Sequence, residues 1–160
     1  MISKTGRILS HGSLRQAPGL RTAPTGHAII RHGMSDTITN GVRVQVESFY
    51  DEDRSSPQES YYFFAYQVTI TNLGEETVQL LSREWIITDA TGRQETVRGP
   101  GVVGEQPMLT TGETFEYTSF CPLSTAVGTM HGSYRMQTAS GLSFDALIGA
   151  FSLAAPHSVN

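Results

Sequence analysis

At 160 residues, the chain is long enough for one domain that buries a hydrophobic core of its own. No apolar run approaches the roughly 18–20 residues that span a bilayer, so we expect a soluble protein with no membrane segment. Residues 1–33 carry five basic and no acidic residues, whereas the rest of the chain carries 15 acidic and six basic ones. This acidic part of the chain would repel the phosphates of a nucleic acid.

Cysteine usage points to a reducing compartment. Cys121 is the only cysteine, and a lone thiol cannot form a disulfide within the chain. We therefore expect a cytoplasmic protein without a disulfide scaffold or a cysteine-based zinc site. The side chain of Cys121 is expected to be a buried apolar thiol and not a reactive nucleophile.

The first 33 residues differ in composition from the rest and predict a disordered N-terminal extension. They are rich in Gly, Ser, Arg and Pro and show no sustained hydrophobic period. An arginine-rich stretch without acidic residues resembles an organelle transit peptide. However, Met34 opens a segment of abruptly different composition. We prefer the interpretation that residues 1–33 are a cloning remnant or follow from a misplaced start codon, and that residues 34–160 form the domain.

After the extension, short segments repeat the period-two pattern of half-buried strands. Val42, Val44 and Val46 alternate with polar residues, and residues 61–72 are dense in aromatic and β-branched side chains. A polar stretch between them, residues 51–60, predicts an exposed loop. Because residues 72–76 are turn material, the next strand, at 78–81, is expected to pair back on 61–72 as a hairpin.

The remaining segments continue in the same way to residue 153. Further strands are expected at residues 85–88, 94–97, 115–119, 130–137 and 142–151. We expect 85–88 and 94–97 to pair across a turn at 89–92, and the last two segments to pair around residues 140–141. About seven to nine short strands with frequent turns, and no helical stripe, predict an all-β antiparallel sandwich or barrel.

A glycine motif lies between two of these strands. Gly99, Gly101 and Gly104 match the spacing G-x-G-x-x-G, which in dinucleotide-binding folds wraps a pyrophosphate at the N-terminus of a helix. That context is missing here, because Pro107 and another strand follow instead of a helix. Without a Cβ, however, glycines can still turn successive backbone N–H groups toward one anion.

Arginines accompany the motif. Arg98 directly precedes Gly99, and Arg93 or Arg83 is expected nearby once the strands pair. A guanidinium offers a planar fork of donors that suits phosphate. Two interpretations stay open: an anion or pyrophosphate site formed by Arg98, Arg93 and the three glycines, or a strand connection in which the glycines only supply positive φ angles.

Neither a metal centre nor a catalytic group stands out. His32, His131 and His157 are far apart and lack metal-ligand spacing. Residues 51–53, Asp-Glu-Asp, lack the spaced oxygen ligands of a calcium loop. There is no G-x-S-x-G elbow for a nucleophilic serine. We therefore expect a protein that is not an enzyme and has no metal ligand set of its own.

Several longer stretches of the sequence resemble the ApaG family. They comprise residues 78–89, 92–93, 97–107, 112–119, 121–124, 128–130, 132–134 and 150–153. The likeness covers nearly all of residues 37–156 and leaves residues 1–33 outside. It implies an immunoglobulin-like or fibronectin type III-like sandwich, in agreement with the strand pattern.

The resemblance also carries implications for function. Bacterial members are linked by name to cobalt and magnesium resistance or efflux, which implies an association with one of these divalent cations. In eukaryotes the domain is appended to F-box proteins and to a polymerase-interacting protein, which implies protein–protein interaction. The glycine motif of the family is suggested to bind pyrophosphate, here at Gly99, Gly101 and Gly104. Members often have histidine where this chain has Glu84, which weakens an imidazole-based site there.

These observations favour a non-enzymatic binding module linked to cobalt and magnesium homeostasis. It would recognise an unidentified partner protein by a sheet face or edge, with an anion at the glycine motif; a homodimer through a sheet face is also open. The alternative is a sensor of pyrophosphate-containing nucleotides or a weak phosphohydrolase accessory.

Overall fold

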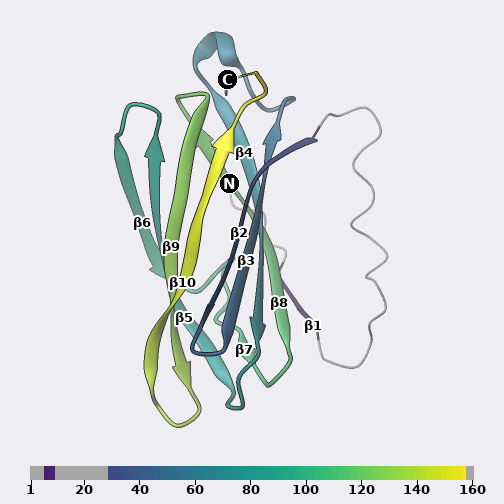
Figure 1. Cartoon of the computed structure of the whole chain (residues 1–160), viewed down its shortest axis with the longest axis vertical. Coiled ribbons are helices and arrows are strands. Elements are labelled where there is room, and N and C mark those ends of the chain that lie inside the picture. Colours follow the sequence, from purple (N-terminus) through teal and green to yellow (C-terminus); the bar gives the residue numbers. More distant parts are fainter. Residues whose placement is uncertain (1–5, 10–28, 158–160) are drawn as a thin grey trace.

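Two antiparallel sheets pack face to face in this computed structural model, which describes residues 6–9 and 29–157 (Figure 1). The first sheet has the order β1 (Gly6–Leu9), β8 (Thr114–Leu123), β4 (Tyr62–Asn72), β3 (Val42–Asp51), β2 (Ile29–Thr39). The second has the order β10 (Ser143–Ala154), β9 (Val127–Thr138), β5 (Val78–Asp89), β6 (Gln94–Pro100), with β7 (Met108–Leu109) paired to the start of β5. A 3₁₀ turn, η1 (Pro57–Glu59), lies between β3 and β4. The predicted antiparallel β-sandwich is confirmed; the likeness to fibronectin type III domains stays a prediction.

The core forms where the inward faces of the two sheets meet. Every second residue of β3 is buried, beginning with Val42 and Val44, as the period-two pattern predicted. In β4 the ring of Tyr66 packs on Trp85 and Phe151 of the second sheet, with ring centroids 5.1 and 6.2 Å apart. Removing these apolar surfaces from water stabilises the sandwich.

On one side, the sandwich is closed by close contact between β10 and the β2–β3 edge of the first sheet (Figure 1). Ser48 Oγ donates a hydrogen bond of 2.8 Å to the carbonyl oxygen of Ser152 in β10. The amide of Leu147 donates one of 3.2 Å to Thr39 Oγ1. A Cβ at Gly33 would lie 2.3 Å from the Ser152 carbonyl oxygen, so this approach requires glycine.

Two expectations about strand connectivity are wrong. β4 pairs with β3 and β8 and not with β5, so the chain crosses from one sheet to the other after Asn72 instead of forming a hairpin. Asn72 holds this crossing, because its Nδ2 donates to the carbonyl oxygens of Glu76 at 2.8 Å and Leu109 at 2.9 Å. The strands expected at 78–81 and 85–88 are one continuous strand, β5, whose register against β9 shifts after Leu80.

The structure describes only part of the expected N-terminal extension, so the domain boundary predicted at residue 34 stays a prediction. Residue 34 falls inside β2, which begins at Ile29, and residues 6–9 form β1 beside β8. The structure therefore places part of residues 1–33 within the first sheet. The rest of the expected extension lies outside the described residues. Among those that are described, no helix is long and apolar enough to cross a membrane.

Candidate functional site

The glycine loop, residues 99–104, leaves the end of β6 and inserts into the sandwich. Val102 at its centre is fully buried in the hydrophobic core. The amide of Val102 donates to the carbonyl oxygen of Glu105 at 2.8 Å, and the amide of Glu105 donates back at 2.9 Å. Val103 and Gly104 at the corner have φ angles of 45° and 80°, the pattern of a tight turn with two left-handed residues. The loop is therefore an apolar plug held by a tight turn.

Backbone donors of the glycine loop are largely engaged within the protein. The amide of Gly101 donates to the carbonyl oxygen of Leu81 at 2.8 Å, in addition to the bonds between Val102 and Glu105. Gly101 has a φ of 61°, and a Cβ there would lie 2.2 Å from the Glu105 carbonyl oxygen. Two of the three motif glycines, Gly101 and Gly104, thus meet steric requirements of the loop itself.

Arg83 is the cation that the fold brings to the glycine loop. It lies on β5 opposite Gly99 of β6, and its Nη1 donates to the carbonyl oxygens of Pro100 at 3.1 Å and Gly101 at 3.0 Å. A Cβ on Gly99 would come within 2.9 Å of Nη1, so this glycine leaves the space that the guanidinium occupies. Within the described ranges, no carboxylate forms an ion pair with Arg83. A half-buried positive charge therefore lies at the rim of the loop.

Within the described residues, the other two arginines of the predicted anion site form no hydrogen bond with the glycine loop, although Arg98 lines the same surface pocket as Arg83 and the first motif glycine. Arg98 forms a cross-strand ion pair with Glu84, with 2.5 Å between Nε and Oε2. Arg93 lies at the β5–β6 turn, at the far end of β6 from the glycine loop, beside Asp89. Sequence reasoning ranked Arg83 behind these two because only the β5–β6 register shows which arginine faces the loop.

Buried tyrosine hydroxyls lie on the interior side of Arg83. The hydroxyls of Tyr117 and Tyr134 form a hydrogen bond with each other in the core. Burial raises the pKa of Tyr66 to about 12 and raises the pKa values of Tyr117 and Tyr134 above their usual range, against a smaller lowering by the charge of Arg83. These hydroxyls stay protonated at neutral pH and are polar members of the core, not general bases.

β6 lies at one edge of the second sheet and, among the strands that the structure describes, pairs with β5 alone. The amide of Asp89 donates to the carbonyl oxygen of Arg93 at 3.0 Å, and that of Gly101 donates to Leu81 at 2.8 Å. Ladder bonds between antiparallel strands alternate, so the odd-numbered residues of β6 direct their N–H and C=O groups to β5. The even-numbered residues direct theirs away from the sheet.

This alternation leaves an unpaired edge. We call the outward N–H and C=O groups of Gln94, Thr96 and Arg98 the open ladder; the side chains of these three residues are exposed. Pro100 has no N–H, and its carbonyl oxygen already accepts a bond from Arg83, so the open ladder ends there. No described strand pairs with this edge.

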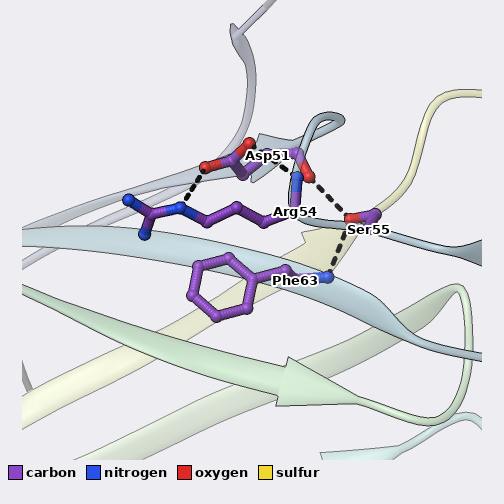
Figure 2. A network of polar contacts seen from close by, with 4 residues as sticks. All are labelled: Asp51, Arg54, Ser55 and Phe63. Atoms are coloured by element: carbon purple, nitrogen blue, oxygen red, sulfur yellow. Dashed lines mark hydrogen bonds and ion pairs between the residues drawn. The ribbon is translucent and has the colours of Figure 1, made fainter. Parts of the chain in front are cut away.

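On the outer face of the first sheet, the guanidinium of Arg54 lies over the ring of Phe63 (Figure 2) and also over that of Phe120. Its guanidinium carbon is 5.4 Å from the ring centroid of Phe63 and 5.3 Å from that of Phe120. Ser55 Oγ donates to the carbonyl oxygen of Asp51 at 2.6 Å and accepts a bond from the Phe63 amide at 2.9 Å (Figure 2). These contacts attach the expected exposed loop to β4 and fix its conformation.

The described residues show no constellation for metal or thiol chemistry. Across 6–9 and 29–157, no group of three or more His, Cys, Asp or Glu side chains is placed to hold a metal ion. Cys121 is buried, as predicted, and burial raises the pKa of its thiol to about 12.

The fold and this site define the class of the protein: an antiparallel β-sandwich whose glycine loop inserts into the core beside an unpaired edge strand. The chain belongs to the ApaG domain family, whose sequence model matches residues 52–138. It is 54% identical over 124 residues to Protein ApaG of Parvibaculum lavamentivorans, covering 78% of this chain and 95% of that protein. It is 57% identical over 119 residues to Protein ApaG of a Methylobacterium species, covering 74% and 92%.

Solved structures agree with this assignment. The crystal structure of a protein described as ApaA from Bordetella pertussis is 49% identical, with a TM-score of 0.71, over 73% of this chain and 95% of that one. The family resemblance predicted from the motifs is confirmed. The names of these relatives state no enzymatic activity.

Proposed function

We propose that this protein is a non-enzymatic binding module that takes an extended segment of a partner protein onto the edge of β6. The observation that carries this proposal is the open ladder of Gln94, Thr96 and Arg98. A segment that adds there gains main-chain hydrogen bonds from groups already aligned by the sheet.

Side chains beside the open ladder supply selectivity, because an added strand places alternate residues on the two faces of the sheet. On the outer face these residues meet Thr96 and the ion pair between Arg98 and Glu84. On the inner face they meet Glu95 and the half-buried Val97, next to a shallow pocket. We expect a partner segment with polar residues on one face and an apolar residue on the other.

A role in cobalt and magnesium homeostasis belongs to the same proposal. The module would influence these ions in the cytoplasm by binding a protein that transports or senses them. Calorimetric titration with cobalt or magnesium chloride distinguishes this route from direct binding: tight binding of either ion by the isolated protein contradicts it.

The test of edge binding removes one outward N–H group. Thr96→Pro deletes this donor and leaves the ladder toward β5 intact, whereas Thr96→Ala keeps the donor and serves as the matched control. In affinity purification from the source organism, we expect wild type and Thr96→Ala to recover one stoichiometric partner and Thr96→Pro to lose it. Recovery of that partner by folded Thr96→Pro would place the binding surface elsewhere.

Arg83 supports a second proposal, in which pyrophosphate or a nucleotide containing it binds at the rim of the glycine loop. The support is its half-buried guanidinium, which no described carboxylate neutralises. A ligand at 100 times its dissociation constant stabilises the folded state by about 2.7 kcal/mol. We expect pyrophosphate or ADP, with or without magnesium, to raise the melting temperature of wild type and of Arg98→Ala but not of Arg83→Ala. An unchanged melting temperature in wild type contradicts this proposal.

A further inference from the structure

We infer that the open ladder also pairs with the same edge of a second copy of this chain, joining two second sheets into one continuous sheet. The inference rests on the proposed function, since both require that the β6 edge accept a strand. In this pairing the strand added to the β6 edge is β6 of a second copy, related to the first by a two-fold axis.

The open ladder determines the register of this pairing. Two copies of β6 related by a two-fold axis run antiparallel, and Thr96 is the middle one of the outward residues Gln94, Thr96 and Arg98. With the axis at Thr96, each Thr96 faces Thr96 of the second copy, and each Gln94 faces Arg98. Every such pair exchanges two main-chain hydrogen bonds, so no group of the open ladder is left without a partner.

Shifting the axis by one residue is less favourable in either direction. An axis at Glu95 places the two Glu95 carboxylates directly opposite each other, and like charges in that position repel. An axis at Val97 places Gln94 opposite Pro100, which has no N–H to donate. The Thr96 register avoids both faults and sets two threonines opposite each other, a favourable cross-strand pair.

The ends of the open ladder limit the strength of this contact. Pro100 bounds it on one side and the turn at residues 89–92 on the other, so the shared edge is short. Self-association is therefore reversible and appears at high protein concentration. Because a partner segment needs the same donors and acceptors, self-pairing and partner binding compete for one edge.

Sedimentation of the full chain from micromolar to millimolar concentration tests the pairing. We expect wild type and Thr96→Ala to shift from the monomer mass toward twice that mass, and Thr96→Pro to associate at least about tenfold more weakly, since two inter-strand hydrogen bonds are lost. Association of folded Thr96→Pro that equals wild type overturns the inference, as does a wild type that stays monomeric at every concentration.

A second variant tests the register without removing a donor. Facing residues of a hydrogen-bonded antiparallel pair have Cα atoms about 5.5 Å apart, a separation that a disulfide bridges. We expect Thr96→Cys to form a covalent dimer under mild oxidation, with no competition from the buried Cys121. Leu142→Cys, at an exposed turn position, is the control and stays monomeric. Equal cross-linking of the two variants overturns the inference.

These outcomes separate the two proposals. A wild type that stays monomeric while Thr96→Pro loses a partner protein leaves the proposed function intact and removes the second copy as an occupant. A dimer that forms through Thr96, with no partner lost in Thr96→Pro, removes the proposed function and leaves the self-pairing.

Discussion

Three glycines illustrate how one sequence pattern follows from separate steric needs. Gly99 leaves room for the Arg83 guanidinium, and Gly101 allows the backbone to pass close to Glu105. Gly104 supplies a left-handed corner with a φ of 80°. Each requirement belongs to the plug that Val102 places in the core, and none of them depends on a bound phosphate.

Alanine at two of these glycines separates crowding from backbone conformation. Gly101→Ala combines a φ of 61° with a Cβ 2.2 Å from a carbonyl oxygen, so we expect a loss of about 2–4 kcal/mol in unfolding free energy. Gly104→Ala, with no atom within 4 Å of its Cβ, should lose only about 1 kcal/mol. Urea unfolding measures the free energy of unfolding of both variants. Equal decreases would show that the short distance between the added Cβ and the Glu105 carbonyl oxygen does not destabilise the fold.

The thiol of Cys121 should be inert in the folded protein. Burial raises its pKa to about 12, so almost no thiolate forms at pH 8. We expect no reaction with Ellman's reagent at pH 8 under native conditions and one equivalent after addition of guanidinium chloride. Stoichiometric reaction of the folded protein within minutes would contradict the observed burial.

At the scale of elements, the positions of turns and strands follow from the sequence more directly than the pairing of one strand with another. The turn at 89–92 was expected to return β6 onto β5, and it does. The turn material after Asn72 was expected to make a hairpin, but it carries the chain to the other sheet. Turn residues show that the chain reverses direction, and they do not specify which strand it meets next.

Proline at two adjacent positions of β6 tests which way its backbone groups point. Thr96→Pro removes an outward donor, and we expect it to cost about 1 kcal/mol or less. Val97→Pro removes a donor that faces β5, so it should cost about 3 kcal/mol or more. Thermal melts monitored by circular dichroism distinguish the two, and a reversed order of stability would refute the assigned alternation.

At the scale of the whole molecule, the two sides of the sandwich are closed by different means. On one side β10 approaches β2 and β3 through Gly33 and the Ser48–Ser152 hydrogen bond. Beside β6, the glycine loop inserts Val102 into the core. The open ladder ends where the glycine loop begins, so the edge that we propose for binding continues into a loop anchored in the core by Val102.

Alanine substitutions at the β2–β10 contact test how tightly the sheets are joined. A Cβ at Gly33 would meet main-chain atoms of Ser152 at 2.3 and 2.7 Å. Neither β2 nor β10 can move away without breaking main-chain hydrogen bonds to its neighbouring strand. We expect Gly33→Ala to destabilise the fold by about 2–4 kcal/mol. At Gly149 the nearest atom is Thr37 Oγ1, 2.6 Å away, which can rotate, so Gly149→Ala should cost about 1 kcal/mol. Similar melting temperatures for both variants would argue against a tight contact.

Stability should fall in alkaline solution. Burial raises the folded-state pKa of Cys121 and of Tyr66 to about 12, and raises the pKa values of Tyr117 and Tyr134 as well. The unfolded chain therefore loses these protons first, so their contribution is complete below about pH 8 and decreases toward pH 12. Urea midpoints at pH 8, 10 and 11 measure this, and the double variant Tyr117→Phe/Tyr134→Phe should show a shallower decline. A midpoint that rises across this range would contradict the burial.

The sequence by itself determined the local features: strands where apolar residues alternate, turns where glycine and aspartate cluster, and a lone thiol in the core. These depend on neighbours a few residues apart, so periodicity and turn chemistry suffice to predict them. Only the tertiary structure decided that Arg83, and not Arg98, donates hydrogen bonds to the glycine loop, and that Thr96 directs its backbone away from the sheet. Both depend on strand register, where a shift of one residue turns every side chain to the other face.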